Sequence, residues 1–216
     1  MSTIFTAAYF ESLLKFMLAL FSIINPMGAV SIFVALTSDK THREVKKIST
    51  ITALTVWITL LVAFFIGNAF LTLFGITIAS FQIGGGVLLS VMALNMMGAK
   101  NHASKINSQE KEQLNANDPI AVVPLAIPML AGPGSISTSI VYSTEFSSPV
   151  DWIFIVLIYT LLAVLIKLIL MSSEFLGRKL GTLGINVLTR IMGLITMALA
   201  VEFISKGIKT IFPSLG

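Results

Sequence analysis

Six long apolar segments constrain this chain more than any other feature of its sequence. Each is long enough to cross the roughly 30 Å hydrocarbon core of a bilayer as an α-helix. None alternates between apolar and polar residues as a barrel strand does, and backbone groups in lipid must be hydrogen-bonded within their own segment. The sequence therefore predicts an all-α polytopic membrane protein with six transmembrane helices. The segments run over Leu13–Leu36, Ile48–Phe70, Ser80–Met97, Ile120–Tyr142, Trp152–Met171 and Val187–Ile204.

The charged residues are few and unevenly placed. Only 11% of the 216 residues are charged, against about 25% in soluble domains. Ten of the 14 Lys and Arg residues fall in three predicted loops, 37–47, 98–118 and 172–190. Because basic loops stay on the cytoplasmic side, these loops should face the cytoplasm and both termini should lie outside. The net charge of +4 is then a topology signal, and no nucleic-acid partner is expected.

Several kinds of chemistry are excluded by what the sequence lacks. The chain has no cysteine, which rules out disulfides and thiol catalysis. It also shows no phosphate-binding Gly-x-x-x-x-Gly-Lys loop, no Ser/His/Asp set and no cluster of metal ligands. We therefore expect neither an enzyme nor an ATP-driven pump.

The two halves of the chain resemble each other. A shift of 109 residues places Gly75–Gly84 over Gly184–Gly193, and a shift of 107 places Pro26 over Pro133. Three spans in each half mean that the second half enters the membrane from the opposite side, as in the inverted repeats of many secondary transporters. We expect a first three-span repeat over residues 1–99, a cytoplasmic linker loop over 100–118 and a second three-span repeat over 119–216.

Helix breakers stand at matching places in the first and fourth spans. Asn25-Pro26-Met27-Gly28 interrupts the first span, and Gly132-Pro133-Gly134-Ser135 interrupts the fourth. A proline inside a helix costs about 3 kcal/mol, and paired interruptions of this kind point to a transporter's binding site. Plain proline kinks are the alternative, and we favour a kink for Pro124 and Pro128.

The predicted site combines these interruptions with the small polar residues that follow them. Free N–H groups at the start of a half-helix would bind a carboxylate, and the carbonyls that end the preceding half could take an ammonium group or a cation. The candidate substrate-binding residues are Asn25, Pro26, Gly28, Ser31, Gly132, Pro133, Gly134, Ser135, Ser137 and Thr138.

Glu202 is a second, separate candidate. It lies in the outer part of the sixth span, one helical turn from Lys206. It could form an i,i+4 ion pair near the membrane surface, or it could couple transport to protons. The sequence leaves both interpretations open.

Three stretches resemble a known family. The run from Val122 to Thr138, the string Asn25-Pro26-Met27-Gly28, and the stretch from Gly184 to Leu194 are similar to motifs of the MarC family of integral membrane proteins. The family pattern has a second proline where this chain has Ser31, which bears on where the first interruption lies and on which substrate fits. The family name refers to a multiple antibiotic resistance locus. The resemblance implies a protein of the cell inner (cytoplasmic) membrane, and at least one relative is described as a transporter of small neutral amino acids.

The first functional hypothesis is a secondary transporter or exporter of small neutral amino acids such as glycine and alanine. A proton or sodium gradient would drive it, and no cofactor is expected. One alternative is a membrane scaffold or regulatory protein without transport, and another is a transporter of a different small solute or drug. The expected partners are the small-molecule substrate and the lipid bilayer, and the sequence leaves open whether the chain forms a homo-oligomer.

Overall fold

The computed structural model describes residues 7–98 and 130–215, and within these ranges every regular element is a helix. This confirms the all-α fold. The elements are α1 Ala7–Ile24, α2 Pro26–Thr37, α3 His42–Leu73, α4 Ile78–Met97, α7 Pro133–Tyr142, α8 Pro149–Met171, α9 Ser173–Ile211 and the short 3₁₀ helix η2 Pro213–Leu215.

Five candidate membrane spans occur among the described residues. They are Ala7–Thr37, which joins α1 and α2, and then α3, α4, α8 and α9. The predicted fourth span overlaps α7, but residues 120–129, with Pro124 and Pro128, lie outside the described residues. The whole predicted linker, 100–118, also lies outside the described residues.

Two helices begin earlier than hydropathy predicts. The N-terminus of α3 is extended to His42 by a capping box, in which Thr41 and Glu44 each bond the other's backbone N–H. Such a box satisfies N–H groups that a bare helix end would leave unpaired. Residues 172–190, expected to be a loop, are mostly helical as the first part of α9. Gly181 interrupts α9 with a backbone φ of 61°, a conformation that glycine adopts at little cost.

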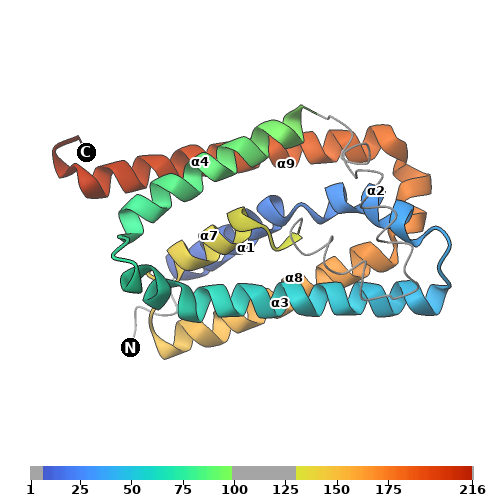
Figure 1. Cartoon of the computed structure of the whole chain (residues 1–216), viewed down its shortest axis with the longest axis horizontal. Coiled ribbons are helices and arrows are strands. Elements are labelled where there is room, and N and C mark those ends of the chain that lie inside the picture. The colour runs from blue at the N-terminus through green and yellow to red at the C-terminus, as the bar shows by residue number, and fades with distance from the viewer. Residues whose placement is uncertain (1–6, 99–129, 216) are drawn as a thin grey trace.

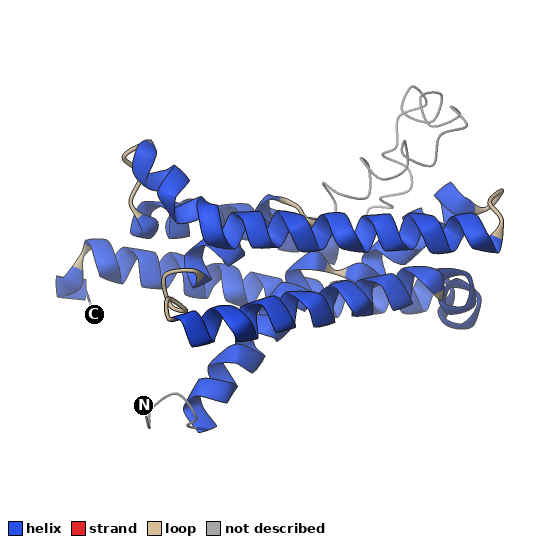
Figure 2. Ribbon diagram, turned by 90° about the horizontal axis from the view of Figure 1, so that it is seen from below, coloured by secondary structure: helices blue, strands red, loops and turns tan. Residues whose placement is uncertain are grey.

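The long helices lie side by side along the long axis of the molecule. α4 packs along α9, and α3 packs along α8. Figure 1 shows α1, α2 and α7 between these two pairs. The first turn of α1 and the last turn of α9 lie at the same end of the bundle, as Figures 1 and 2 both show.

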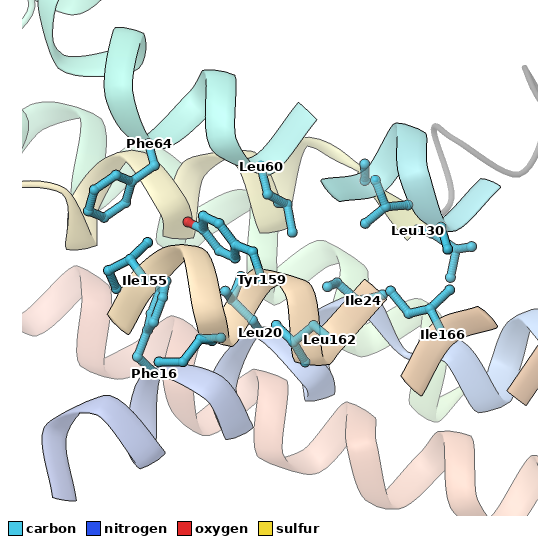
Figure 3. Packing of buried hydrophobic residues seen from close by; sticks show 14 of the residues in the cluster. Phe16, Leu20, Ile24, Leu60, Phe64, Leu130, Ile155, Tyr159, Leu162 and Ile166 are labelled. Carbon is cyan, nitrogen blue, oxygen red and sulfur yellow. The ribbon is translucent and has the colours of Figure 1, made fainter. Parts of the chain in front are cut away.

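The centre of the bundle is apolar and contains large rings. Tyr159 of α8 is fully buried, with its ring centroid 5.9 Å from that of Phe16 in α1 and 6.2 Å from that of Phe64 in α3 (Figure 3). Large apolar side chains also cover the outside, such as Leu73, which is 81% exposed, and Ile153, which is 68% exposed. Helices that are apolar on all sides suit a lipid surrounding rather than water.

α4 and α9 approach each other through glycines. A Cβ added at Gly86 would lie 2.8 Å from the Ala200 carbonyl oxygen, and one added at Gly207 would lie 2.8 Å from the Ala79 carbonyl oxygen. Small residues let helix backbones pack this closely in membranes. Gly84, in contrast, has nothing within 4 Å of such a Cβ.

Candidate functional site

A single residue, Asn25, separates α1 from α2. It has a left-handed backbone conformation with φ 46°, which Asn tolerates better than most residues other than glycine. Its side-chain oxygen accepts a hydrogen bond from the Gly28 N–H at 3.2 Å. Pro26, which has no N–H, starts α2 with the φ that a helix needs. The sequence Asn-Pro-x-Gly thus encodes this local geometry.

Gly28 keeps this cap in place because it has no side chain. A Cβ there would overlap the Asn25 amide nitrogen and would lie 3.3 Å from the Thr189 hydroxyl of α9. α2 then continues through Ser31, which is partly buried, to Thr37. The helix is therefore regular at the position where the family pattern has its second proline.

One turn before Asn25, α1 is joined to α9 by buried hydroxyl groups. The Ser22 hydroxyl donates to the Met192 carbonyl at 3.1 Å and lies 3.3 Å from the Thr196 hydroxyl. Ser22 is 1% exposed and Thr196 is fully buried. These bonds hold the end of α1 against α9.

The second interruption precedes α7. Gly132 is extended, with φ −73° and ψ 175°, and provides no side-chain cap, while Pro133 is the first residue of the helix. The Gly132 carbonyl accepts from the Ile136 N–H at 3.1 Å and from the Ser135 hydroxyl at 3.0 Å. Within the described part of the chain, the N–H groups of Gly134 and Ser135 have no such partner. They are the free donors that a helix N-terminus offers to an anion.

The serines and the threonine of α7 are buried, and two of their hydroxyl groups are already bonded to backbone carbonyls at the start of the helix. Thr138 donates to the Gly134 carbonyl at 2.8 Å, and Ser135 donates to the Gly132 carbonyl. Ser137 lies against Gly85 of α4. Ser139 is fully buried, and among the described residues no hydrogen-bond partner lies within the usual distance of its oxygen. The bonded hydroxyls remain available as acceptors, for example for an ammonium group.

The two interruptions lie next to each other. A Cβ added at Gly134 would lie 3.3 Å from the Ile23 side chain, two residues before Asn25, and 2.7 and 2.8 Å from Met92 and Leu89 of α4. From this neighbourhood α2 and α7 run towards opposite ends of the long axis (Figure 1). The N-terminus of α7 therefore lies against the last turn of α1, just before the residue at which α2 begins.

Not every candidate residue lies at this junction. Pro133 is exposed, whereas Gly132, Gly134 and Ser135 beside it are buried. The Glu202 side chain is 61% exposed, and its carboxylate lies 4.0 Å from the Lys206 ammonium, which is also 3.8 Å from the Glu145 carboxylate. The predicted i,i+4 ion pair is present, and a coupling role for Glu202 stays a prediction.

Sequence reasoning missed the partners that complete the junction. Ser22, Ile23 and Thr189 contact it but carry no motif of their own. Ser22 lies in the last turn of α1, three residues before Asn25, and this closeness in sequence is a signal that could have indicated it. Thr189 and Thr196 could not have been found this way, because their place depends on how α9 packs. Among the described residues, no three His, Cys, Asp or Glu side chains gather into a metal-binding group.

Comparison with known proteins agrees with the resemblance seen in the motifs. The family model described as "MarC family integral membrane protein" matches residues 10–212. The "UPF0056 membrane protein YhcE" of Escherichia coli (strain K12) is 42% identical over 202 residues, covering 93% of this chain and 94% of the relative. The archaeal "UPF0056 membrane protein MJ1677" of Methanocaldococcus jannaschii is 39% identical over 191 residues, covering 88% of this chain and 93% of the relative. No solved structure matches the chain significantly.

Proposed function

Because the chain belongs to the MarC family of integral membrane proteins, we propose that it is a secondary transporter of small neutral amino acids such as glycine or alanine. The observation that carries this proposal is the approach of the two interruptions: Gly134, at the start of α7, lies against Ile23, two residues before the Asn25 at which α2 begins. Substrate sites in secondary transporters lie between such half-helices. The substrate class itself comes from the resemblance to the family.

Packing supports two inverted halves. α3 lies antiparallel to α8, since Trp57 donates to Thr160 at 3.1 Å and Phe65, further along α3, makes an edge-to-face contact with Trp152, which is earlier in α8. α4 also lies antiparallel to α9. Gly207, late in α9, faces Ala79 early in α4, whereas Gly86, later in α4, faces Ala200 earlier in α9. An inverted repeat with a two-fold axis in the membrane plane would pair each helix with its counterpart in this way. In this arrangement α1 and α2 form one broken first span, and α7 ends the broken fourth span.

The chemistry of the junction suits a small zwitterion. A substrate carboxylate would bind the N–H groups of Gly134 and Ser135, where the α7 dipole is positive. Pro26 has no N–H, so the Ser22 carbonyl loses its helical partner and would accept a substrate ammonium group. The residues that form the junction carry no charge, which favours a neutral side chain. Gly28 and Gly134 let backbone and ligand approach closely, which favours a small one.

Transport into liposomes tests the proposal. Purified protein should take up labelled glycine or alanine when a proton or sodium gradient is imposed. Gly134→Leu should lower this uptake by roughly tenfold or more, the factor that corresponds to a loss of about 1.4 kcal/mol in substrate-binding free energy. Gly84→Leu is the matched control, because Gly84 is exposed and its Cβ position is open.

Two results would count against this function. Absence of uptake for every small amino acid, from protein of known orientation, would remove the substrate class. Full activity in a cellular assay by correctly folded Gly134→Leu and Asn25→Ala variants would instead favour a scaffold or regulatory protein. Glu202→Gln tests coupling in the same liposomes: uptake independent of the gradient would support a coupling role, and unchanged gradient dependence would refute it.

A further inference from the structure

A separate polar pocket lies at one end of the bundle, far along α2 from the interruption at Asn25. It is formed where α2 and α8 end and where α3 and α9 begin, and these four helix ends meet at the same end of the long axis (Figure 1). Its volume is about 320 Å³, and its lining includes Thr37, Lys40, His42, Ser173 and Glu174. Neither interruption contributes a residue to it.

Ser173 gives this pocket an unused hydrogen-bonding group. The residue is only 2% exposed, it lines the pocket, and its hydroxyl makes no hydrogen bond within the described ranges 7–98 and 130–215. A hydroxyl of this kind can donate to and accept from a ligand or water in the pocket. Ser173 is also the first residue of α9, whose N-cap Ser172 makes no side-chain cap bond, so the positive end of that helix faces the same place.

The charges around Ser173 favour an anion. The Lys40 side chain is 26% exposed, and its ammonium lies 3.4 Å from the carboxylate of Asp39, which is 73% exposed. That single ion pair leaves further N–H donors on Lys40, and His42 adds a ring donor. Glu174 is the acidic lining residue, but its side chain is 77% exposed and is paired with Arg178 at 3.5 Å. Its charge is thus balanced outside the pocket.

The surroundings indicate that the anion carries apolar chains. Leu168 of α8 and Phe175 and Leu183 of α9 are 52%, 57% and 79% exposed, and the Lys179 ammonium lies 5.5 Å from the Phe175 ring centroid. Aromatic and basic residues of this kind mark the membrane–water interface. Basic pockets between helix ends in this zone bind phospholipid head groups.

We propose that the pocket bounded by Lys40, His42 and Ser173 binds the phosphate group of an anionic phospholipid. Lys40 and the Ser173 hydroxyl would donate to the phosphate oxygens, and the acyl chains would lie on the exposed apolar side chains nearby. This site does not depend on the proposed transport function.

Lipid binding to the delipidated full chain in detergent tests the site. Phosphatidylglycerol should bind saturably and raise the unfolding temperature, and Ser173→Ala and Lys40→Gln should each weaken its apparent Kd by about tenfold, as expected for a lost hydrogen bond to a charged group. The controls are Ser172→Ala, an exposed neighbouring serine, and Lys47→Gln, an exposed lysine of α3 that does not line the pocket. Both controls should bind as the unaltered chain does.

Two further ligands test whether the bound phosphate group belongs to an anionic lipid. Inorganic phosphate and phosphatidylcholine should bind at least tenfold more weakly, because the first lacks acyl chains and the second carries a cationic head group. Equal binding of phosphatidylglycerol by the pocket variants and the controls would overturn the site. Tight binding of inorganic phosphate that requires Ser173 would overturn the lipid assignment. Lys40→Arg, which keeps the charge, should retain most of the affinity and shows that a loss in Lys40→Gln is not misfolding.

Discussion

Asn25 shows how much depends on one residue at the first interruption. It combines a left-handed backbone with a side chain that caps α2. Few residues do both: glycine adopts the conformation but has no side chain to accept the capping bond, and alanine can do neither well. Asn25 is therefore the point where the local geometry of the candidate site is most easily changed.

We predict that Asn25→Ala lowers the free energy of unfolding by about 1–3 kcal/mol, through the lost cap and the strained backbone. Asn25→Gly should cost less than Asn25→Ala, because glycine adopts the left-handed conformation freely. Denaturant titration in detergent measures both. Asn95→Ala is the control, since Asn95 is an exposed asparagine on α4 without such a role. Equal stability of the two Asn25 variants would contradict the backbone argument.

Ser22 acts at the same scale, by tying the end of α1 to α9. Ser22→Ala should lower the free energy of unfolding by about 0.5–1.5 kcal/mol, the net value of a typical hydrogen bond. Ser12 is a matched control on the same helix, because its hydroxyl is exposed and bonds only the Ala8 carbonyl one turn back. Ser12→Ala should leave stability nearly unchanged, and equal losses in both variants would show that the bond to α9 contributes nothing.

At the scale of elements, the contact between α4 and α9 depends on which glycine faces which backbone. Gly84, Gly85 and Gly86 are consecutive, yet only a Cβ at Gly86 would meet the backbone of α9. Gly85 faces Ser137 of α7, and Gly84 faces outward. The run of three glycines therefore serves two different helix contacts and one exposed position.

Alanine substitutions at these glycines should change the free energy of unfolding in opposite directions. Gly84→Ala should raise the free energy of unfolding by up to about 1 kcal/mol, because alanine favours the helix and meets nothing. Gly86→Ala and Gly207→Ala should lower it by about 1–3 kcal/mol, because the two backbones must separate. Free energies of unfolding measured for the three variants in the same detergent test these predictions. A gain in stability for Gly86→Ala would mean that the two helices are not held this closely.

At the scale of the whole molecule, the basic loops predict its orientation in the membrane. α8 offers a direct test, because Ser147 precedes its first residue and Ser172 follows its last, and both serines are exposed. The chain has no cysteine, so single-cysteine variants need no altered background.

We predict that a membrane-impermeant thiol reagent applied to intact cells labels Ser147→Cys and spares Ser172→Cys. The physical reason is the concentration of Lys and Arg in loops 37–47 and 172–190, which should hold the Ser172 end in the cytoplasm. Labelling of both variants after membrane disruption is the control. The opposite pattern in intact cells would reverse the orientation and place both termini inside.

The sequence by itself determined that the long apolar segments among the described residues are helices, and it located the interruptions at Asn25 and Gly132. Apolar segments of spanning length can only be helices in lipid, and Asn-Pro-x-Gly and Gly-Pro-Gly-Ser encode their own local conformations at Asn25 and Gly132. These local conformations depend on residues within one turn of each other, so they can be predicted from the sequence alone.

Only the tertiary structure decided which of those residues meet. Three contacts join residues that lie far apart in the chain. Ile23 contacts Gly134, Ser22 is bonded to α9, and Gly86 rather than Gly84 faces the backbone of α9. The pocket around Ser173 also joins distant residues, in a segment that hydropathy predicted to be a loop. Apolar patterns do not specify such contacts in this chain, because its helices are apolar towards lipid as well as towards each other. The rotation of each helix is then set by close packing and a few hydrogen bonds between helices.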